Sequence, residues 1–156
     1  QMLGLLDIQG TGNDLNNTIT GNRGDNLLEG GAGADNLVGG LGGDGFILSS
    51  SDSIDTIVDF ESGVDLVLID AIEFGLFDTD TLTGYAEGIV KAEDFATIEQ
   101  GQTLNSASDA NFIFDKNNGA LSIDLDGAGL LDAVQIATLD INQSDDLIAT
   151  DLYVLL

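Results

Sequence analysis

Acidic and amide side chains recur at a fixed interval near the start of the chain. Asn17, Asn26, Asp35 and Asp44 lie nine residues apart, and the segment GGAGADNLVGGLGGDGF, residues 30–46, contains eight glycines. Each glycine loses more backbone freedom on folding than any other residue, so this density indicates φ values that a Cβ forbids. Carboxylate and carbonyl oxygens gathered in such a turn are the ligands of hard cations such as calcium.

The overall charge favours the same chemistry. The 156-residue chain has 28 acidic residues and three basic ones, which gives a net charge of −25. This charge opposes compaction, so bound cations would stabilise a folded form. An acidic surface that serves only solubility, as in halophilic proteins, is the alternative explanation. Nucleic acids and anionic membranes are disfavoured as partners, because binding them requires Lys and Arg.

The chain lacks the residues that several classes of active site require. The chain has no Cys and no His, which removes Ser-His-Asp triads, Cys-His dyads, zinc sites and haem ligation. A glycosidase pair of carboxylates is disfavoured, because 28 acids produce chance pairs and the chain has no Trp for a sugar platform. No apolar run could span a bilayer, and the first residues lack the basic region of a signal peptide. We expect a chain that is not an enzyme and that was excised from a longer one.

The interval reflects a nonapeptide repeat. Four copies follow one another without gaps, at 12–20, 21–29, 30–38 and 39–47. Their sixth positions are Asn17, Asn26, Asp35 and Asp44, and their eighth positions are Ile19, Leu28, Leu37 and Phe46. We expect residues one to six to form a turn and the last three a short strand whose position-eight side chain points inward. Two nonapeptides would then complete one coil of a right-handed parallel β-roll, with loops stacked at roughly 4.8 Å.

The repeat continues in degenerate form. With two residues inserted, SSDSIDTIV (50–58) places Asp55 at position six and Ile57 at position eight. With one more inserted, FESGVDLVL (60–68) places Asp65 and Val67 there. We therefore expect six half-turns, or three stacked coils.

A cation between two stacked loops would collect about six oxygens, within the range that calcium accepts. The candidate ligands are the position-six side chains and the turn residues of the two complete repeats. They are Asn17, Asn26, Gly30, Gly31, Ala32, Gly33, Asp35, Gly39, Gly40, Leu41, Gly42, Asp44, Asp55 and Asp65. Neutral amides contribute less than carboxylates, so sites built from Asp35 and Asp44 should be tighter. The alternative is a metal-free solenoid in which Asp and Asn only cap turns.

Residues 12–68 resemble the RTX (repeats-in-toxin) family. The third and fourth repeats match G-G-x-G-x-D-x-U-x at every fixed position, and SIDTIVDFESGVDLVLI resembles the stretch that follows the repeats in serralysin-like proteases. FIFDKNNGALSIDLDG, AVQIATL and DLYVLL resemble the C-terminal parts of such proteins. The resemblance implies an all-β fold, a parallel β-roll with a hairpin-rich C-terminal cap, several calcium ions, and a bacterial protein that is secreted or on the cell surface.

The second half of the chain changes character, so we divide one continuous domain into a roll, 1–68, and a cap, 69–156. NFIFD and ALSIDLD flank KNNG, which favours a hairpin. AVQIATLDI and DLIATDLYVLL predict further strands, and KAEDFATI (91–98) a single helical turn. Asp124, Asp126 and Asp132 could suggest a second calcium loop, but Gly127 arrives too early for the EF-hand pattern. We prefer an ordinary turn there.

The C-terminal segment DLYVLL, residues 151–156, has two interpretations. It is a strand of the cap in the folded chain, or by resemblance the uncleaved signal of type I secretion, whose exporter would be a transient partner. Both hold together if export precedes folding.

Two functions remain open. The first is a calcium-binding RTX module that folds after export and stabilises a larger secreted protein. The alternative is a calcium-dependent surface-layer, adhesin or polysaccharide-associated module, which exposed aromatic clusters would favour. The oligomeric state, the number of ions and the activity of a parent protein are not indicated by the sequence.

Overall fold

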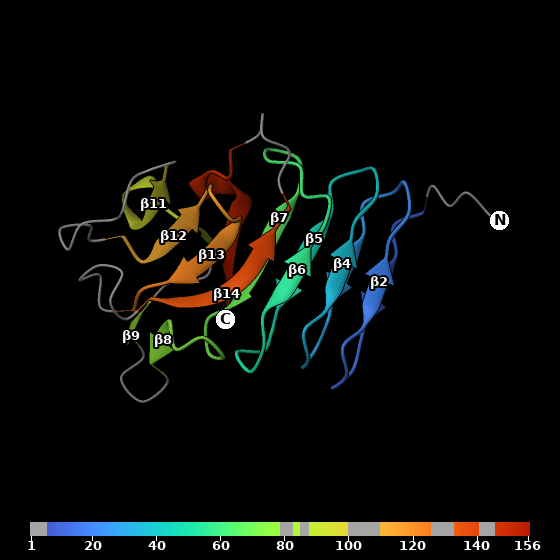
Figure 1. The fold of residues 1–156 in the computed structure, drawn as a ribbon, viewed down its shortest axis with the longest axis horizontal. Coiled ribbons are helices and arrows are strands. Elements are labelled where there is room, and N and C mark those ends of the chain that lie inside the picture. The colour runs from blue at the N-terminus through green and yellow to red at the C-terminus, as the bar shows by residue number, and fades with distance from the viewer. Residues whose placement is uncertain (1–5, 79–82, 85–87, 100–109, 126–132, 141–145) are drawn as a thin grey trace.

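The computed structural model describes residues 6–78, 83–84, 88–99, 110–125, 133–140 and 146–156. In these ranges the chain is all β, apart from two 3-10 turns, η1 (Ala92–Asp94) and η2 (Ala149–Asp151). Figure 1 shows the N-terminal strands stacked in a regular row, with the cap at the other end. None of the described helices is long and apolar enough to cross a membrane.

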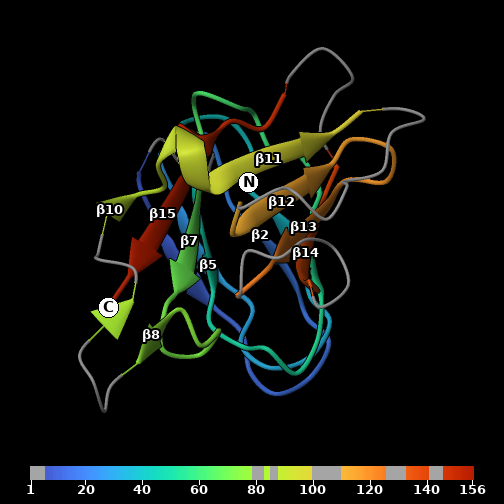
Figure 2. The same ribbon diagram turned by 90° about the vertical axis from the view of Figure 1, so that its left-hand side faces the viewer.

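Two sheets face each other across the core (Figure 2). The first sheet contains, in spatial order, β1 (Gln9–Thr11), β3 (Leu27–Glu29), β5 (Gly45–Leu48), β7 (Leu66–Asp70), β15 (Leu152–Leu155) and β10 (Gly88–Ile89). The second contains β11 (Phe95–Ile98), β12 (Phe112–Asp115), β13 (Ala120–Ile123), β14 (Val134–Leu139), β6 (Asp55–Ile57), β4 (Asn36–Val38) and β2 (Thr18–Thr20). A separate hairpin pairs β8 (Phe77–Asp78) with β9 (Thr83–Gly84).

Successive strands from β1 to β7 alternate between the two sheets. Each strand from β1 to β5 therefore pairs in parallel with the strand two places further along the chain. Leu28 pairs with Phe46 in the first sheet, and Leu37 with Ile57 in the second. This register confirms the parallel β-roll of nonapeptides, including the insertions that the sequence places before β6 and β7.

The position-eight side chains fill the interior of the roll. Leu28, Leu37, Phe46, Ile57 and Val67 are fully buried and belong to one hydrophobic cluster that continues into the cap. The strand alternation predicted from the sequence is confirmed by this burial, because neighbouring positions seven and nine are more exposed.

The roll begins a half-turn earlier than the sequence predicts. Strand β1 precedes the first predicted repeat, and the carbonyl of Ile8 accepts a hydrogen bond from Leu27 N at 2.8 Å. The segment LGLLDIQGT, residues 3–11, lacks both signals of the repeat: position six is Ile8 and position eight is Gly10. β1 therefore forms by pairing with β3, although its sequence lacks the inward apolar side chain from which a strand could be predicted.

The cap extends both sheets of the roll without a break. β14 pairs in parallel with β6, and β15 with β7. The predicted hairpin is present as β12 and β13, with Gly119 at φ +73° in its turn. Only residues 92–94 of KAEDFATI form a helical turn, because Phe95–Ile98 pairs with β12 as a strand. Asp124 is buried, whereas Asp126 and Asp132 lie outside the described residues.

We expect Leu37→Ala to lower the free energy of unfolding in saturating calcium by about 2–5 kcal/mol, because it leaves a cavity at a fully buried position. Leu41→Ala is the matched control, since Leu41 belongs to the next loop and is 61% exposed. Denaturant unfolding of both variants checks this. Equal losses would contradict the assigned inward face.

Candidate metal site

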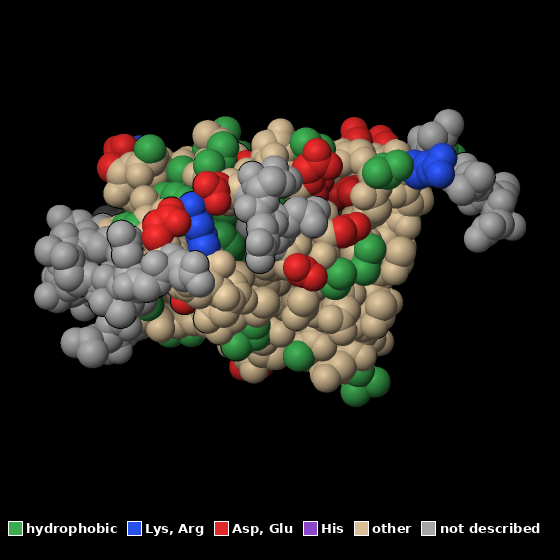
Figure 3. All heavy atoms as spheres, turned by 45° about the horizontal axis from the view of Figure 1, so that its top comes forward, with side chains coloured by type: hydrophobic (Ala, Val, Ile, Leu, Met, Phe, Trp, Pro, Cys, Tyr) green, Lys and Arg blue, Asp and Glu red, His purple; other side chains and the backbone are tan. Residues whose placement is uncertain are grey.

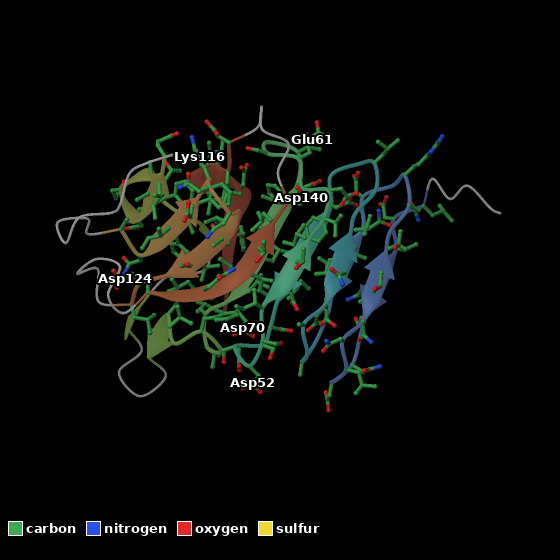
Figure 4. The ribbon with its side chains drawn as sticks, in the orientation of Figure 1. Asp52, Glu61, Asp70, Lys116, Asp124 and Asp140 are labelled. Carbon is green, nitrogen blue, oxygen red and sulfur yellow. The ribbon has the colours of Figure 1, made fainter. Side chains whose placement is uncertain are left out.

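The loops between the strands form two edges of the roll. Loops 12–17, 30–35 and 49–54 make the first edge, and loops 21–26, 39–44 and 58–65 make the second. In Figure 4, Asp52 marks the first edge at the bottom of the view and Glu61 the second at the top. Each loop faces the loop one coil away, and position six is its last residue, except after loop 49–54, where the position-six residue Asp55 begins β6. The candidate ligands of the sequence analysis are therefore brought together along two lines.

Glycine allows the stacked loops to approach closely. Gly40 and Gly42 have φ values of +108° and +118°, in the left-handed region that favours glycine. A Cβ on Gly40 would overlap the carbonyl oxygen of Asn22, and one on Gly42 would lie 2.7 Å from that of Gly24. Gly31 and Gly33 occupy the equivalent places on the first edge. Backbone carbonyl oxygens of one loop thus lie directly against the next loop.

The position-six carboxylates form a ladder across the coils. Each accepts a hydrogen bond from the backbone N–H of the position-six residue one coil earlier. The pairs are Asn17 N to Asp35 Oδ1 at 2.6 Å, Asn26 N to Asp44 Oδ1 at 2.7 Å, Asp35 N to Asp55 Oδ1 at 3.0 Å and Asp44 N to Asp65 Oδ1 at 2.8 Å. All four of these Asp residues are buried. The sequence thus places acids in the interior at one-coil intervals.

No basic side chain compensates these buried acids within the described ranges. The ion pairs found there join Lys116 to Glu99 at 2.6 Å and to Asp146 at 2.9 Å, both in the cap. Arg23 is exposed. Figure 3, with the second edge turned forward, shows acidic side chains over this face and few basic ones. Uncompensated buried carboxylates are costly, so the ladder requires either protons or cations.

Two carboxyls in the ladder, those of Asp55 and Asp65, have a raised pKa. Burial raises the pKa of Asp55 from 3.8 to about 6, and repulsion from Asp35 adds to the shift against a hydrogen bond that lowers it. Burial likewise raises the pKa of Asp65, with repulsion from Asp44 and Asp59. The two pairs Asp35/Asp55 and Asp44/Asp65 are therefore where negative charge accumulates.

The donor atoms fit a hard cation. Asp35 Oδ2 is buried and accepts no hydrogen bond within the described residues. It lies against Gly30, where a Cβ would overlap it. No group of three acidic side chains converges in the described part of the chain, so a cation beside Asp35 would take most of its ligands from backbone carbonyls. A carboxylate oxygen among carbonyl oxygens suits calcium.

Other predicted site residues are partly engaged already. The carbonyl of Gly33 accepts the hydroxyl hydrogen bond of Ser53 from the next coil. Leu41 N donates to Asn22 O at 3.0 Å, while its side chain is exposed. Asn17 Oδ1 accepts a hydrogen bond from Asn13 N within its own loop, at 2.8 Å. Ala32 is half-buried, and Gly39 is buried against the Asp44 carboxylate.

Sequence reasoning missed a second set of carboxylates that join the coils. Asp59 accepts hydrogen bonds from Gly39 N at 2.8 Å and Gly40 N at 2.9 Å. Asp25, at position five, accepts one from Gly43 N at 2.9 Å. Asp7, Asn16 and Asp25 are spaced by nine residues and all act in this way. That spacing was the available signal for position five. For Asp59 the signal was its place in the RTX-like stretch SIDTIVDFESGVDLVLI, which did not indicate the N–H groups that it binds.

Comparison with known proteins supports the repeat assignment. Residues 11–46 match the family model of the RTX calcium-binding nonapeptide repeat, in four copies. None of the curated proteins is significantly similar to the chain. The match covers the loops that end at Asn17, Asn26, Asp35 and Asp44, so this segment consists of RTX repeats.

The raised pKa of Asp55 predicts a pH dependence of the calcium-free chain. Between its unfolded value of 3.8 and its folded value of about 6, the folded chain binds more protons than the unfolded chain. The free energy of unfolding therefore falls as pH rises through this window. We expect more β structure at about pH 5 than at about pH 7 in calcium-depleted buffer, measured by circular dichroism.

Asp55→Asn tests the assignment to this carboxyl. The variant should lose part of the pH dependence, because the amide keeps an oxygen for Asp35 N and carries no charge. Asp52→Asn, on the same edge but exposed, is the control. A pH profile of Asp55→Asn that matches the parent chain would contradict this origin.

Proposed function

We propose that this chain, whose residues 11–46 match the RTX calcium-binding repeat, folds when it binds calcium outside the cell and stabilises a larger secreted bacterial protein. The observation that carries the proposal is the ladder of buried position-six carboxylates, which no described basic side chain neutralises. Calcium, when bound, supplies the positive charge that this ladder lacks.

The chain offers its best ligand sets where two acids occupy neighbouring position-six places. These are Asp35 with Asp55 on the first edge and Asp44 with Asp65 on the second. Carbonyl oxygens of the intervening turns would complete the sets; the candidates are those of Gly30, Gly31, Ala32, Gly33, Gly39, Gly40, Leu41 and Gly42. Asn17 is a weaker position-six ligand, because an amide carries no charge.

The same features make folding depend on the cation. Without it, carboxylate repulsion and the backbone entropy of the glycine loops oppose the roll. The folded loops bring the ligands together and the unfolded chain does not, so binding shifts the equilibrium towards the folded state. In a cytosol with scarce free calcium the repeats would stay unfolded and open to a type I exporter.

We also propose that the chain has no catalytic activity of its own, since it contains neither His nor Cys. A module that binds polysaccharide or a cell surface is less well supported. Phe46 and Phe60 of the roll are buried against each other, with ring centroids 6.2 Å apart. The large exposed apolar side chains of the described residues are all aliphatic.

We expect excess chelator to leave residues 12–68 largely unfolded and millimolar calcium to restore β structure cooperatively, with magnesium a poor substitute. Asp35→Ala and Asp44→Ala should each raise the calcium concentration at half-folding about tenfold or more, because each removes a charged ligand. Circular dichroism during calcium titration measures both effects.

Asp14→Ala is the matched control, because Asp14 is an exposed acid in loop 12–17. Asn17→Ala should fall between the control and the two Asp variants. Equal effects for all four variants would contradict the assigned ligands, and an unchanged β spectrum in chelator would contradict the folding switch.

The C-terminal strand has a structural role that affects any test of export. β15 lies between β7 and β10 in the first sheet, and Leu152 and Val154 are buried. Asp151 is buried too, and its carboxylate accepts hydrogen bonds from Ser62 Oγ at 2.6 Å and Gly63 N at 3.0 Å. The segment therefore holds the loop that carries Asp65. We propose that the same residues serve as the export signal before folding.

Two variants separate these roles. Deleting residues 151–156 should abolish export by a matching type I exporter and also destabilise the calcium-loaded chain. Val67→Ala should lower the melting temperature in calcium while leaving the amount exported unchanged, because it creates a cavity at the buried partner of Leu152 and leaves residues 151–156 intact. Export of the truncated chain at the parent level would refute the signal, whatever the melting curves show.

A further inference from the structure

Asn26 makes contacts that the other position-six residues do not make. It is buried, and its backbone N–H donates to Asp44 Oδ1 at 2.7 Å like the other members of the ladder. Its side-chain Nδ2 also donates, to the same Asp44 Oδ1 at 2.7 Å and to the carbonyl oxygen of Gly24. One amide group thus joins a carbonyl of loop 21–26 to a carboxylate of loop 39–44.

Gly24 O and Asp44 Oδ1 are oxygens of the type that could both bind one cation. A position-four carbonyl of one loop and a position-six carboxylate of the next are both hydrogen-bond acceptors, so they need a donor or a positive charge between them. Between Asp44 and Asp65 the position-six side chains are both acceptors when ionised, and neither offers an N–H. Between Asn26 and Asp44, the side-chain amide of Asn26 supplies the N–H donor.

The orientation of the amide follows from its surroundings. Asn26 Oδ1 is buried and accepts no hydrogen bond within the described residues. The reversed orientation would turn Oδ1 towards Gly24 O and Asp44 Oδ1, so that three acceptors would meet without a donor. Leaving Asn26 Oδ1 unpaired costs less than giving up the two hydrogen bonds that Asn26 Nδ2 donates, one of which goes to a carboxylate.

We propose that the Asn26 amide replaces a calcium ion between loops 21–26 and 39–44. This inference rests on the proposed calcium function and sharpens it. The second edge is joined without metal at its N-terminal end and binds calcium only from the Asp44/Asp65 pair onwards. The contact between loops 21–26 and 39–44 is therefore independent of calcium, whereas the contact between loops 39–44 and 58–65 depends on it. Asp44 takes part in both contacts.

Asn26→Asp tests this by restoring the acid at position six. The variant should bind one calcium ion more than the parent chain in isothermal titration, and in chelator its β signal should be weaker, because two carboxylates then face each other. Asn26→Ala is the matched control: it also loses the amide bridge, but it should bind the same number of ions as the parent. Asp44→Asn should bind at least one ion fewer.

The outcomes separate the two proposals. A parent chain that binds no calcium would overturn the proposed function and this inference with it. A parent that binds calcium and an Asn26→Asp variant with the same number of ions would overturn the inference alone. Failure of Asn26→Asp to fold in saturating calcium would also overturn it, because an Asp/Asp pair at this place should then behave like Asp44/Asp65.

Discussion

Repulsion between stacked carboxylates is the constraint on which the rest of this structure depends. A parallel roll brings equivalent residues of successive coils to about one strand spacing, so any acid placed at position six faces its own copy. The backbone N–H groups of the ladder satisfy one oxygen of each carboxylate. They leave the charge itself uncompensated. A fold built this way is stable only where protons, amides or cations intervene. At position six the chain has amides in the first two repeats, at Asn17 and Asn26, and acids in the later ones.

The period of nine residues was sufficient to predict the architecture of the roll. It fixed which side chains point inward, so that Leu28, Leu37 and Phe46 could be placed in the core from sequence alone. The hairpin of the cap followed from its Asn-Gly turn. These features share one property: a local pattern of residue types determines them, and the tertiary structure only repeats that pattern.

What the sequence did not indicate depends on contacts between distant segments. β1 exists because β3 pairs with it, although Gly10 offers no apolar side chain to the core. Asp59 and Asp151 bind backbone N–H groups of loops that are near only in the folded chain. The parallel pairing of β14 and β15 with the last strands of the roll likewise has no local signal. Through this pairing the cap covers the last coil and supports the loop of Asp65.

We propose that cations lie between the stacked acids of the two edges. The most direct measurement is the anomalous scattering of calcium in crystals grown with calcium chloride. We expect anomalous peaks between Asp35 and Asp55 and between Asp44 and Asp65, and none between Asn26 and Asp44. Crystals in which the roll is folded at neutral pH with no anomalous peak beside any of these acids would contradict it.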